Sequence, residues 1–256
     1  MLLAIDIGNS NVVVGGLQDN RIAFQTRIAT DHIKTSDEYA VEIKNMLDLS
    51  KVQVAEVEDC IISSVVPPVF NSIATGVRKL TGMEPLVVAP GVKTGLNIRM
   101  DNPASVGSDL IVAAVAAIQD YEPPLILIDM GTATTITVVD KGNAYIGGVI
   151  IPGIRVSAEA LSNRAAQLPG IQLDRPGRVI GRNTVESMRS GIMYGAAATM
   201  DGMIERIEEE LGRPVNHVLA TGGIAQFVAP LCRRELKLER DLLLKGLNII
   251  YHKNRA

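Results

Sequence analysis

Two aspartates, each set inside an otherwise apolar run, are the residues of this chain best suited to chemistry. Asp6 lies in LLAIDIGNSN and Asp129 lies in LILIDMGTAT. Burying a carboxylate is costly unless the charge is paired or faces a ligand. Each aspartate is followed two residues later by a glycine, whose turn can present backbone N–H groups to phosphate oxygens. Because a carboxylate does not bind phosphate directly, the pattern predicts a cation held between the aspartates and a nucleotide, such as Mg²⁺.

The two turns also carry neutral hydrogen-bond donors. These donors are Asn9, Ser10, Asn11, Thr132 and Thr134. A single Asp-x-Gly-[Asn/Thr] motif is equally compatible with a tight hairpin in which the aspartate caps local amides. The repetition of the motif at matching places favours a shared nucleotide site.

The spacing of the two aspartates extends to the segments around them. Asp129 follows Asp6 by 123 positions, and this offset aligns 2–7 with 125–130, 12–14 with 135–137, and Asn20 with Asn143 without a gap. Each copy is predicted to form three strands followed by helices. The sequence therefore predicts a duplicated α/β architecture.

The predicted elements follow from hydrophobic periodicity and turn residues. Strands are expected at 2–7, 11–17, 21–29, 60–66, 85–89, 125–130, 134–139, 144–151 and 215–221. Helices are expected at 35–49, opened by the capping box Thr35-x-x-Glu38, and at 69–80, 103–121, 156–164, 185–211 and 240–254. We expect two domains, 1–118 and 119–256, and leave open whether the final helix packs back on the first.

Two further motifs complete the candidate chemistry. Asp109 stands behind Gly107 at the start of an apolar helix, where it is suited to act as a general base or, alternatively, only to complement the helix dipole. The Gly222-Gly223 turn after a buried strand would let an adenine or ribose approach the backbone, although a plain turn has the same sequence.

Composition excludes several classes of protein. Apolar residues make up 47% and charged residues 21%, typical of a folded globular chain. A net charge of −3 and an aromatic content of 3% argue against a nucleic-acid surface. No apolar run reaches the roughly 18 residues needed to span a bilayer. The N-terminus lacks the basic start of a signal peptide, so we expect a cytoplasmic protein in which Cys60 and Cys232 are buried, reduced thiols.

Six motifs together resemble the type III pantothenate kinases over about residues 1–250. In order, they are DIGNSN, TGLNIRMDNPASVGSDL, DMGTATT, GGVIIPG, NTVESMRSGIMYG and ATGG. The resemblance implies the acetate and sugar kinase, Hsp70 and actin fold, with two ribonuclease-H-like domains and ATP in the cleft between them. It also implies a cytosolic homodimer that phosphorylates pantothenate to 4′-phosphopantothenate, the first step of coenzyme A biosynthesis, with Mg²⁺ and K⁺ or NH₄⁺.

The resemblance also implies roles for particular residues. Asp109 matches the general base, Asp129 the ligand of the monovalent cation, and Asp6 a ligand of Mg²⁺ through water. Nucleotide contacts are implied for Asp6, Ile7, Gly8, Asn9, Ser10, Asn11, Val12, Val13, Gly131, Thr132, Gly222 and Gly223. Pantothenate contacts are implied for Met100, Gly107, Ser108, Asp109, Leu110 and, from the neighbouring subunit, Thr184.

Three positions depart from the family pattern. Leu110 replaces an arginine suited to an anionic substrate, Met100 replaces an aromatic residue, and Thr137 stands where an aspartate is frequent. Arg99, Arg155 and Arg182 are candidates to compensate for the missing arginine. Two alternatives therefore stay open: a kinase of the same fold acting on another small hydroxy acid or polyol, and a non-catalytic ATP-binding regulator.

Overall fold

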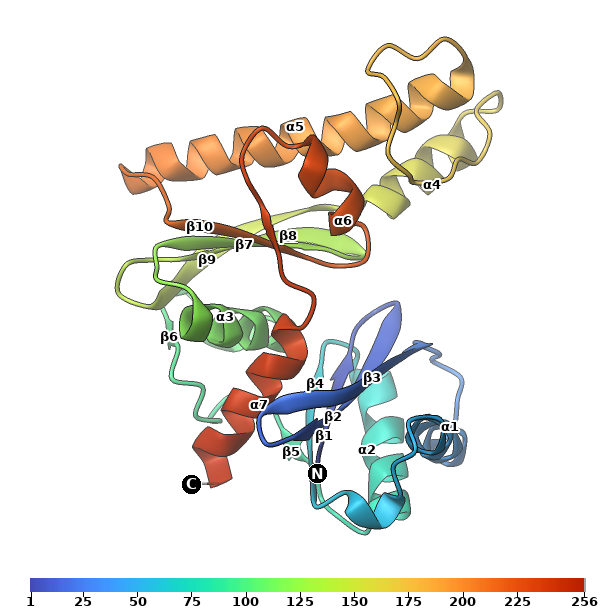
Figure 1. Cartoon of the computed structure of the whole chain (residues 1–256), viewed down its shortest axis with the longest axis vertical. Helices are drawn as coiled ribbons and strands as arrows, with labels where there is room; N and C mark the ends of the chain where they lie inside the picture. Colours follow the sequence, from blue (N-terminus) through green and yellow to red (C-terminus); the bar gives the residue numbers. More distant parts are fainter. Residues whose placement is uncertain (256) are drawn as a thin grey trace. The chain divides into compact units, whose positions relative to one another are not determined.

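The computed structural model describes residues 1–255, which form two compact units, each built on one sheet (Figure 1). Unit 1 comprises Met1–Leu96, Asp101–Ala117 and the described chain from Asp241 onward. Unit 2 comprises Asn97–Met100 and Ile118–Arg240. The C-terminal segment therefore belongs to the unit that contains the N-terminus.

The two sheets share one strand order, which confirms the predicted duplication. In unit 1 the order is β3 (Arg21–Ala29), β2 (Asn11–Gln18), β1 (Leu2–Ile7), β4 (Asp59–Ser64) and β5 (Leu86–Val87). In unit 2 the corresponding order is β9 (Ala144–Pro152), β8 (Ala133–Val139), β7 (Leu125–Met130), β10 (His217–Thr221) and β11 (Lys237–Leu238), and β6 (Asn97–Ile98) adds to β9. In each sheet the first three strands pair antiparallel, and the next pair is parallel.

The ungapped alignment of the two copies is wrong at the first turn. Asp6 pairs with Val13 across its hairpin, whereas Asp129 pairs with Thr135, so the second turn is shorter by one residue. The following turn restores the offset, because Asn20 and Asn143 both adopt left-handed backbone angles, with φ of 61° and 57°. Between these two turns, the positions of β8 are therefore displaced by one residue relative to the ungapped alignment with β2.

The helices follow the predicted pattern, and only one long helix starts more than two residues from its predicted position. Unit 1 contains α1 (Ser36–Leu49), α2 (Pro67–Thr81), α7 (Leu242–Arg255) and most of α3 (Ser108–Asp120); unit 2 contains α4 (Ile154–Arg164), α5 (Thr184–Leu211) and the single turn α6 (Ala225–Val228). Short 3₁₀ turns occupy Val54–Glu56, Pro103–Ser105 and Ala229–Leu231. The long helix expected from 103 begins only at Ser108, because Val106 is extended, with φ −72° and ψ 128°.

In unit 1 the alternation of side chains along the strands separates the core from the site. Ile5 and Ile7 face the core formed with α1 and α2, so Asp6 projects from the opposite face of the sheet. Helix α7 packs on that opposite face, where a Cβ atom on Gly15 would lie 2.5 Å from Leu244. Helix α7 also contacts α3, since a Cβ on Gly246 would lie 2.0 Å from the Val112 carbonyl oxygen.

Unit 2 repeats this arrangement. Ile126 and Ile128 face a core that includes Met193 and Met200 of α5, which lies along one face of the sheet (Figure 1). Asp129 therefore projects from the face that α5 does not cover. No helix within residues 1–255 combines the length and apolarity that crossing a bilayer requires.

Candidate functional site

The carboxyl ends of β1 and β4 place the first predicted carboxylate. These strands are parallel neighbours, and Asp6 lies in register with Ser63. Both residues are buried, with exposed fractions of 5% and 0%, and the Ser63 hydroxyl donates a hydrogen bond to Asp6 Oδ1. The charge of Asp6 is thus supported by a donor on the adjacent strand.

The start of α3 is fastened to the same end of β4. The Ser64 N–H donates to Ser108 Oγ over 3.1 Å, and the Ser108 hydroxyl donates back to the Ser64 carbonyl over 3.0 Å. Ser64 pairs with Ile7, the residue after Asp6. Asp6 and Asp109 therefore occupy the same edge of unit 1, although 103 residues separate them in the sequence.

Asp109 has the surroundings of a carboxyl group that readily accepts a proton. Burial raises the pKa of Asp109 above its ordinary value, and this effect outweighs the backbone N–H groups that stabilise the charge. One of these groups is the Leu110 N–H, which donates to Asp109 Oδ1 over 2.9 Å. Gly107 leaves room for the carboxylate, because a Cβ there would lie 2.6 Å from Asp109 Oδ1.

The turn after Asp6 is held closed by its own backbone and by β3. The Gly8 N–H donates to the Asn11 carbonyl over 3.0 Å, and the Thr30 hydroxyl donates to the Gly8 carbonyl over 2.6 Å. The side chains of Asn9, Ser10 and Asn11 are exposed. Ile7, Val12 and Val13 are buried, so in this turn only the main chain of these three residues can serve a ligand.

The turn after Asp129 converges with the glycine turn after β10. Asp129 lies in register with Thr221, and Gly222 has a φ of 95°. A Cβ on Gly222 would lie 2.5 Å from the Met130 carbonyl oxygen and 2.8 Å from Asp129 Oδ1. This close approach excludes any larger residue and brings two oxygen atoms, both of them suitable cation ligands, to one place.

Other predicted residues of unit 2 lie in these two turns or inside the core. Gly131, Thr132 and Gly223 are exposed in the two turns. Thr134 is 2% exposed and pairs with Met130 on the core face, so the sequence prediction of Thr134 as a phosphate donor is wrong. The shorter second turn explains the error, because Thr134 is the structural equivalent of Val12 rather than of Asn11.

The predicted pantothenate contacts are divided between the units. Gly107, Ser108, Asp109 and Leu110 lie in unit 1. Met100 belongs to unit 2, where its sulfur would lie 3.7 Å from a Cβ on Gly147, and Thr184 is the exposed first residue of α5. Of the arginines considered as substitutes, Arg99 forms an ion pair of 3.2 Å with Asp140. Helix α3 itself contains no arginine that could take the place of the one that Leu110 replaces.

Sequence reasoning missed Ser63 and Thr30. In the sequence, the only indication of Ser63 is its place at the end of an apolar run. This place becomes informative once β4 is known to pair with β1. Thr30 follows β3 and has no local motif at all.

The cysteines are both free, and neither is poised for chemistry. Cys60 is buried, and burial raises the pKa of its thiol. Cys232 is only partly buried, contrary to the expectation, yet desolvation still raises its pKa to about 12. Neither thiol ionises near neutral pH.

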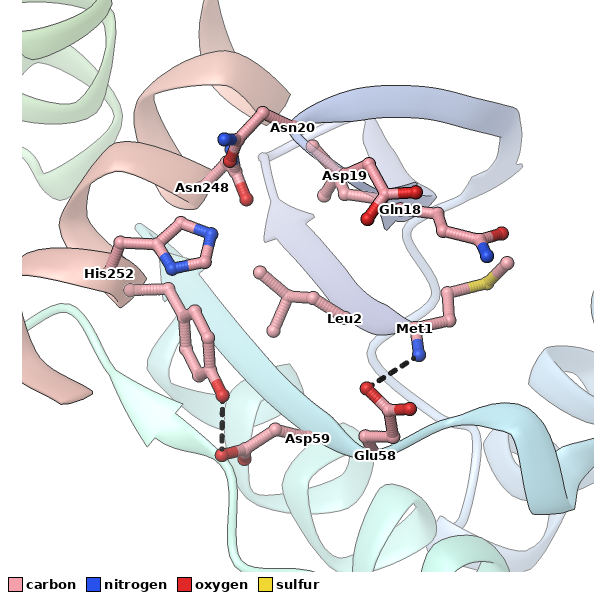
Figure 2. Close-up of a pocket in the computed structure, with 11 residues that line it drawn as sticks. Met1, Leu2, Gln18, Asp19, Asn20, Glu58, Asp59, Asn248 and His252 are labelled. Atoms are coloured by element: carbon pink, nitrogen blue, oxygen red, sulfur yellow. Dashed lines mark hydrogen bonds and ion pairs between the residues drawn. The ribbon is translucent and has the colours of Figure 1, made fainter. Parts of the chain in front are cut away.

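A cavity of about 460 Å³ in unit 1 is lined by neither Asp6 nor Asp109. It adjoins Leu2 and Asp59, at the amino ends of β1 and β4 (Figure 2). Asp6 and Ser64 lie near the carboxyl ends of the same strands. Tyr251 of α7 closes one side by donating to Asp59 Oδ2 over 3.0 Å. None of the predicted site residues lines this cavity, so the candidate chemistry lies elsewhere in the unit.

Within residues 1–255, no cluster of three His, Cys, Asp or Glu side chains is placed to hold a metal ion. A cation at Asp6 or Asp129 would therefore complete its coordination with main-chain oxygens, water or a ligand.

A family model and two full-length relatives all match this chain under one family name. The family model for type III pantothenate kinase matches residues 2–206. The type III pantothenate kinase of an Exiguobacterium species is 44% identical over 255 residues, covering 100% of both chains. That of Halalkalibacterium halodurans is 43% identical over 254 residues, covering 99% of this chain and 100% of its own.

Solved structures support the fold. The activator of 2-hydroxyisocaproyl-CoA dehydratase from Clostridium difficile, with bound ADPNP, superposes with a TM-score of 0.58 at 12% identity, covering 99% of this chain and 94% of its own. A ROK family glucokinase from Streptomyces griseus, in complex with glucose and AMPPNP, gives 0.54 at 13% identity, covering 99% of both chains. These likenesses identify the duplicated ribonuclease-H-like fold. On the match of the family model and the full-length identity with two of its members, the chain belongs to the type III pantothenate kinase family.

Proposed function

We propose that Asp109 is the general base with which this chain carries out the reaction of its family. That reaction is the ATP-dependent phosphorylation of pantothenate to 4′-phosphopantothenate, the first step of coenzyme A biosynthesis. The observation that carries the proposal is the placement of a carboxyl group of raised pKa at the start of α3, fastened beside the Asp6 turn.

The chemistry requires such a group because a primary alcohol ionises only far above neutral pH. Asp109 would accept the hydroxyl proton of pantothenate as the oxygen bonds to the γ-phosphorus of ATP and ADP leaves. Asp109 Oδ1 accepts the Leu110 N–H, and the carboxylate has further lone pairs that could take the proton. Burial suits this role, since a raised pKa brings the base closer to the working pH.

The Asp6 turn is proposed to bind the phosphates of ATP. Exposed Asn9, Ser10 and Asn11 supply donors. Asp6 fits a Mg²⁺ ligand acting through water because it is the penultimate residue of buried β1, next to that turn. Bound Mg²⁺ would neutralise charge on the transferred phosphoryl group.

Asp129 is proposed to hold the monovalent cation, K⁺ or NH₄⁺. Asp129 Oδ1 and the Met130 carbonyl converge around Gly222, and an oxygen-only donor set suits a hard cation such as K⁺. Gly131, Thr132, Gly222 and Gly223 are proposed to complete the nucleotide contacts of unit 2.

The substrate site is proposed to need a second copy of the chain. Thr184 would contact pantothenate from the neighbouring subunit, alongside Met100 and the 107–110 segment. An apolar surface near Thr184 supports a homodimer, because unit 2 exposes several large apolar side chains on α4, at the start of α5 and in the segment before it. These are Val156, Leu161, Val179, Ile180 and Val185. The family's metabolic role further supports a cytoplasmic location.

A coupled assay of ADP release tests these assignments. ADP is expected only with pantothenate and Mg²⁺ present, and its rate is expected to rise when K⁺ or NH₄⁺ replaces Na⁺. A panel of small hydroxy acids and polyols addresses the Leu110 departure, since a better acceptor than pantothenate would overturn the substrate assignment. ATP turnover that is equally fast without any acceptor would contradict the proposed mechanism.

A further inference from the structure

Two adjacent serines lie at the carboxyl end of β4. One contacts Asp6, and the other contacts Ser108, the residue before Asp109. Ser63 lies in register with Asp6, and Ser64 lies in register with Ile7. Ser63 contacts Asp6 through its side chain, whereas Ser64 contacts Ser108 through its main chain. The two contacts are one residue apart on a single strand.

The Ser63 contact is enclosed within the unit. Both partners project from the sheet face that α7 also packs on, and Ser63 has no exposed surface. A serine hydroxyl has one proton, and here that proton is donated to Asp6 Oδ1. A buried bond of this kind fixes the orientation of the carboxylate.

The Ser108 hydroxyl both accepts and donates a hydrogen bond in its contact with Ser64. Ser108 Oγ accepts the Ser64 N–H and donates to the Ser64 carbonyl, at 3.1 and 3.0 Å. With its single proton committed, this hydroxyl cannot also donate to a substrate. The contact with pantothenate proposed for Ser108 therefore does not use its hydroxyl as a donor.

We infer that Ser63 and Ser108 are positioning residues that set Asp6 and Asp109 in register with each other before the substrates bind. This inference rests on the proposed roles of the two aspartates. We call the contacts among Ser63, the Ser64 main chain and Ser108 the serine relay. Transfer needs the base and the phosphate turn at a fixed separation, and a displacement of about 1 Å can cost roughly 10²-fold in rate.

We expect substitutions at the two ends of the serine relay, Ser63 and Ser108, to have different kinetic effects. Ser63→Ala removes a donor from the proposed Mg²⁺ ligand, so KM for MgATP is expected to rise about tenfold while KM for pantothenate stays within twofold. Ser108→Ala frees the residue next to the base, so kcat is expected to fall roughly 10- to 100-fold with KM for MgATP unchanged. In this variant the acid limb of the pH–kcat profile is also expected to move, because the burial of Asp109 changes.

Matched variants separate positioning from loss of a hydroxyl. Thr81→Val removes a partly buried hydroxyl that donates to the Val77 carbonyl at the end of α2, and Ser105→Ala removes one that donates to the Asn102 carbonyl. Both controls are expected to keep kcat and both KM values within twofold. Ser108→Thr retains the hydroxyl and is expected to recover most of kcat.

A buried alanine at position 63 could lower stability, so Ser63→Cys is measured beside it. The cysteine nearly preserves volume but is a weak donor, and KM for MgATP is expected to rise in this folded variant too. Thermal melting of every variant establishes that the kinetics describe folded protein.

The outcomes distinguish the relay from the proposed function. If Asp109→Asn loses turnover but Ser63→Ala, Ser63→Cys and Ser108→Ala match their controls, the relay is refuted and the base assignment stands. If Asp109→Asn keeps full turnover, the base assignment fails whatever the serine variants do. Equal losses in kcat and in both KM values, in step with lowered melting temperatures, would make the serines structural only and would also refute the relay.

Discussion

Replacing Asp109 with asparagine separates catalysis from stability in one variant. The side chains have nearly the same shape, and the asparagine oxygen can still accept the Leu110 N–H. The variant lacks a group that takes the hydroxyl proton, so kcat is expected to fall about 10²- to 10⁴-fold. That loss corresponds to about 3 to 5.5 kcal/mol of transition-state stabilisation. ATP binding is expected to stay within about twofold, because the Asp6 turn is untouched.

The same change is expected to stabilise the fold at neutral pH. Burial raises the pKa of Asp109, so the unfolded chain loses this proton at lower pH than the folded chain does. The wild type therefore loses stability as pH rises through the interval between the two pKa values, and the asparagine variant does not. The melting temperature of Asp109→Asn should exceed that of the wild type at pH 7.5, and the difference should shrink as pH falls towards about 4.

Asp37→Asn is the matched control for these measurements. Asp37 also lies in the first turn of a helix, but it is exposed and forms an ion pair of 2.7 Å with Lys79. If Asp109 only complemented the helix dipole, both variants would lose a few tenths of a kcal/mol and keep turnover. Turnover in Asp109→Asn within tenfold of the wild type, or a lower melting temperature at pH 7.5, would refute the reasoning.

Three further changes test the packing around the site. Gly222→Ala places a Cβ 2.5 Å from the Met130 carbonyl in a left-handed conformation, so activation by K⁺ should weaken, seen as a higher half-saturating K⁺ concentration; an unchanged K⁺ titration would contradict the proposed cation site. Gly246→Ala places a Cβ 2.0 Å from the Val112 carbonyl, so urea unfolding should show a loss of about 1 to 3 kcal/mol despite the better helix propensity of alanine; a gain would contradict the close packing of α7 on α3. Thr35→Ala removes the capping box of α1 and should lower the free energy of unfolding by about 1 kcal/mol, with kcat unchanged; no change by urea titration would argue against the cap.

Local signals in the sequence predicted most of the secondary structure. The capping box of α1 is present, with the Glu38 N–H donating to Thr35 and the Thr35 N–H donating to Glu38. The repeated Asp-x-Gly turns predicted a duplication, which the common strand order of the two sheets confirms. The cap depends on residues within a few positions of one another and the duplication on direct comparison of two segments, which is why one sequence suffices to find them.

Features that depend on distant pairing were missed or misplaced. The one-residue difference between the two turns becomes visible only in the register of Asp129 with Thr135, and it moved Thr134 from the predicted site into the core. The role of Ser63 is visible only in the structure, where its hydroxyl donates to Asp6, 57 residues earlier in the chain. The late start of α3 reflects an extended Val106, and the low helix propensity of Val106 and Gly107 was outweighed in the prediction by the apolar run that follows.

The most direct test of the account is ³¹P NMR of the purified protein mixed with ATP, Mg²⁺, K⁺ and pantothenate. The account predicts that ADP and a phosphate monoester of pantothenate form in equal amounts, and that neither forms at a comparable rate with Asp109→Asn. Formation of ADP with an equal amount of inorganic phosphate and no monoester, or undiminished monoester from the variant, would contradict it.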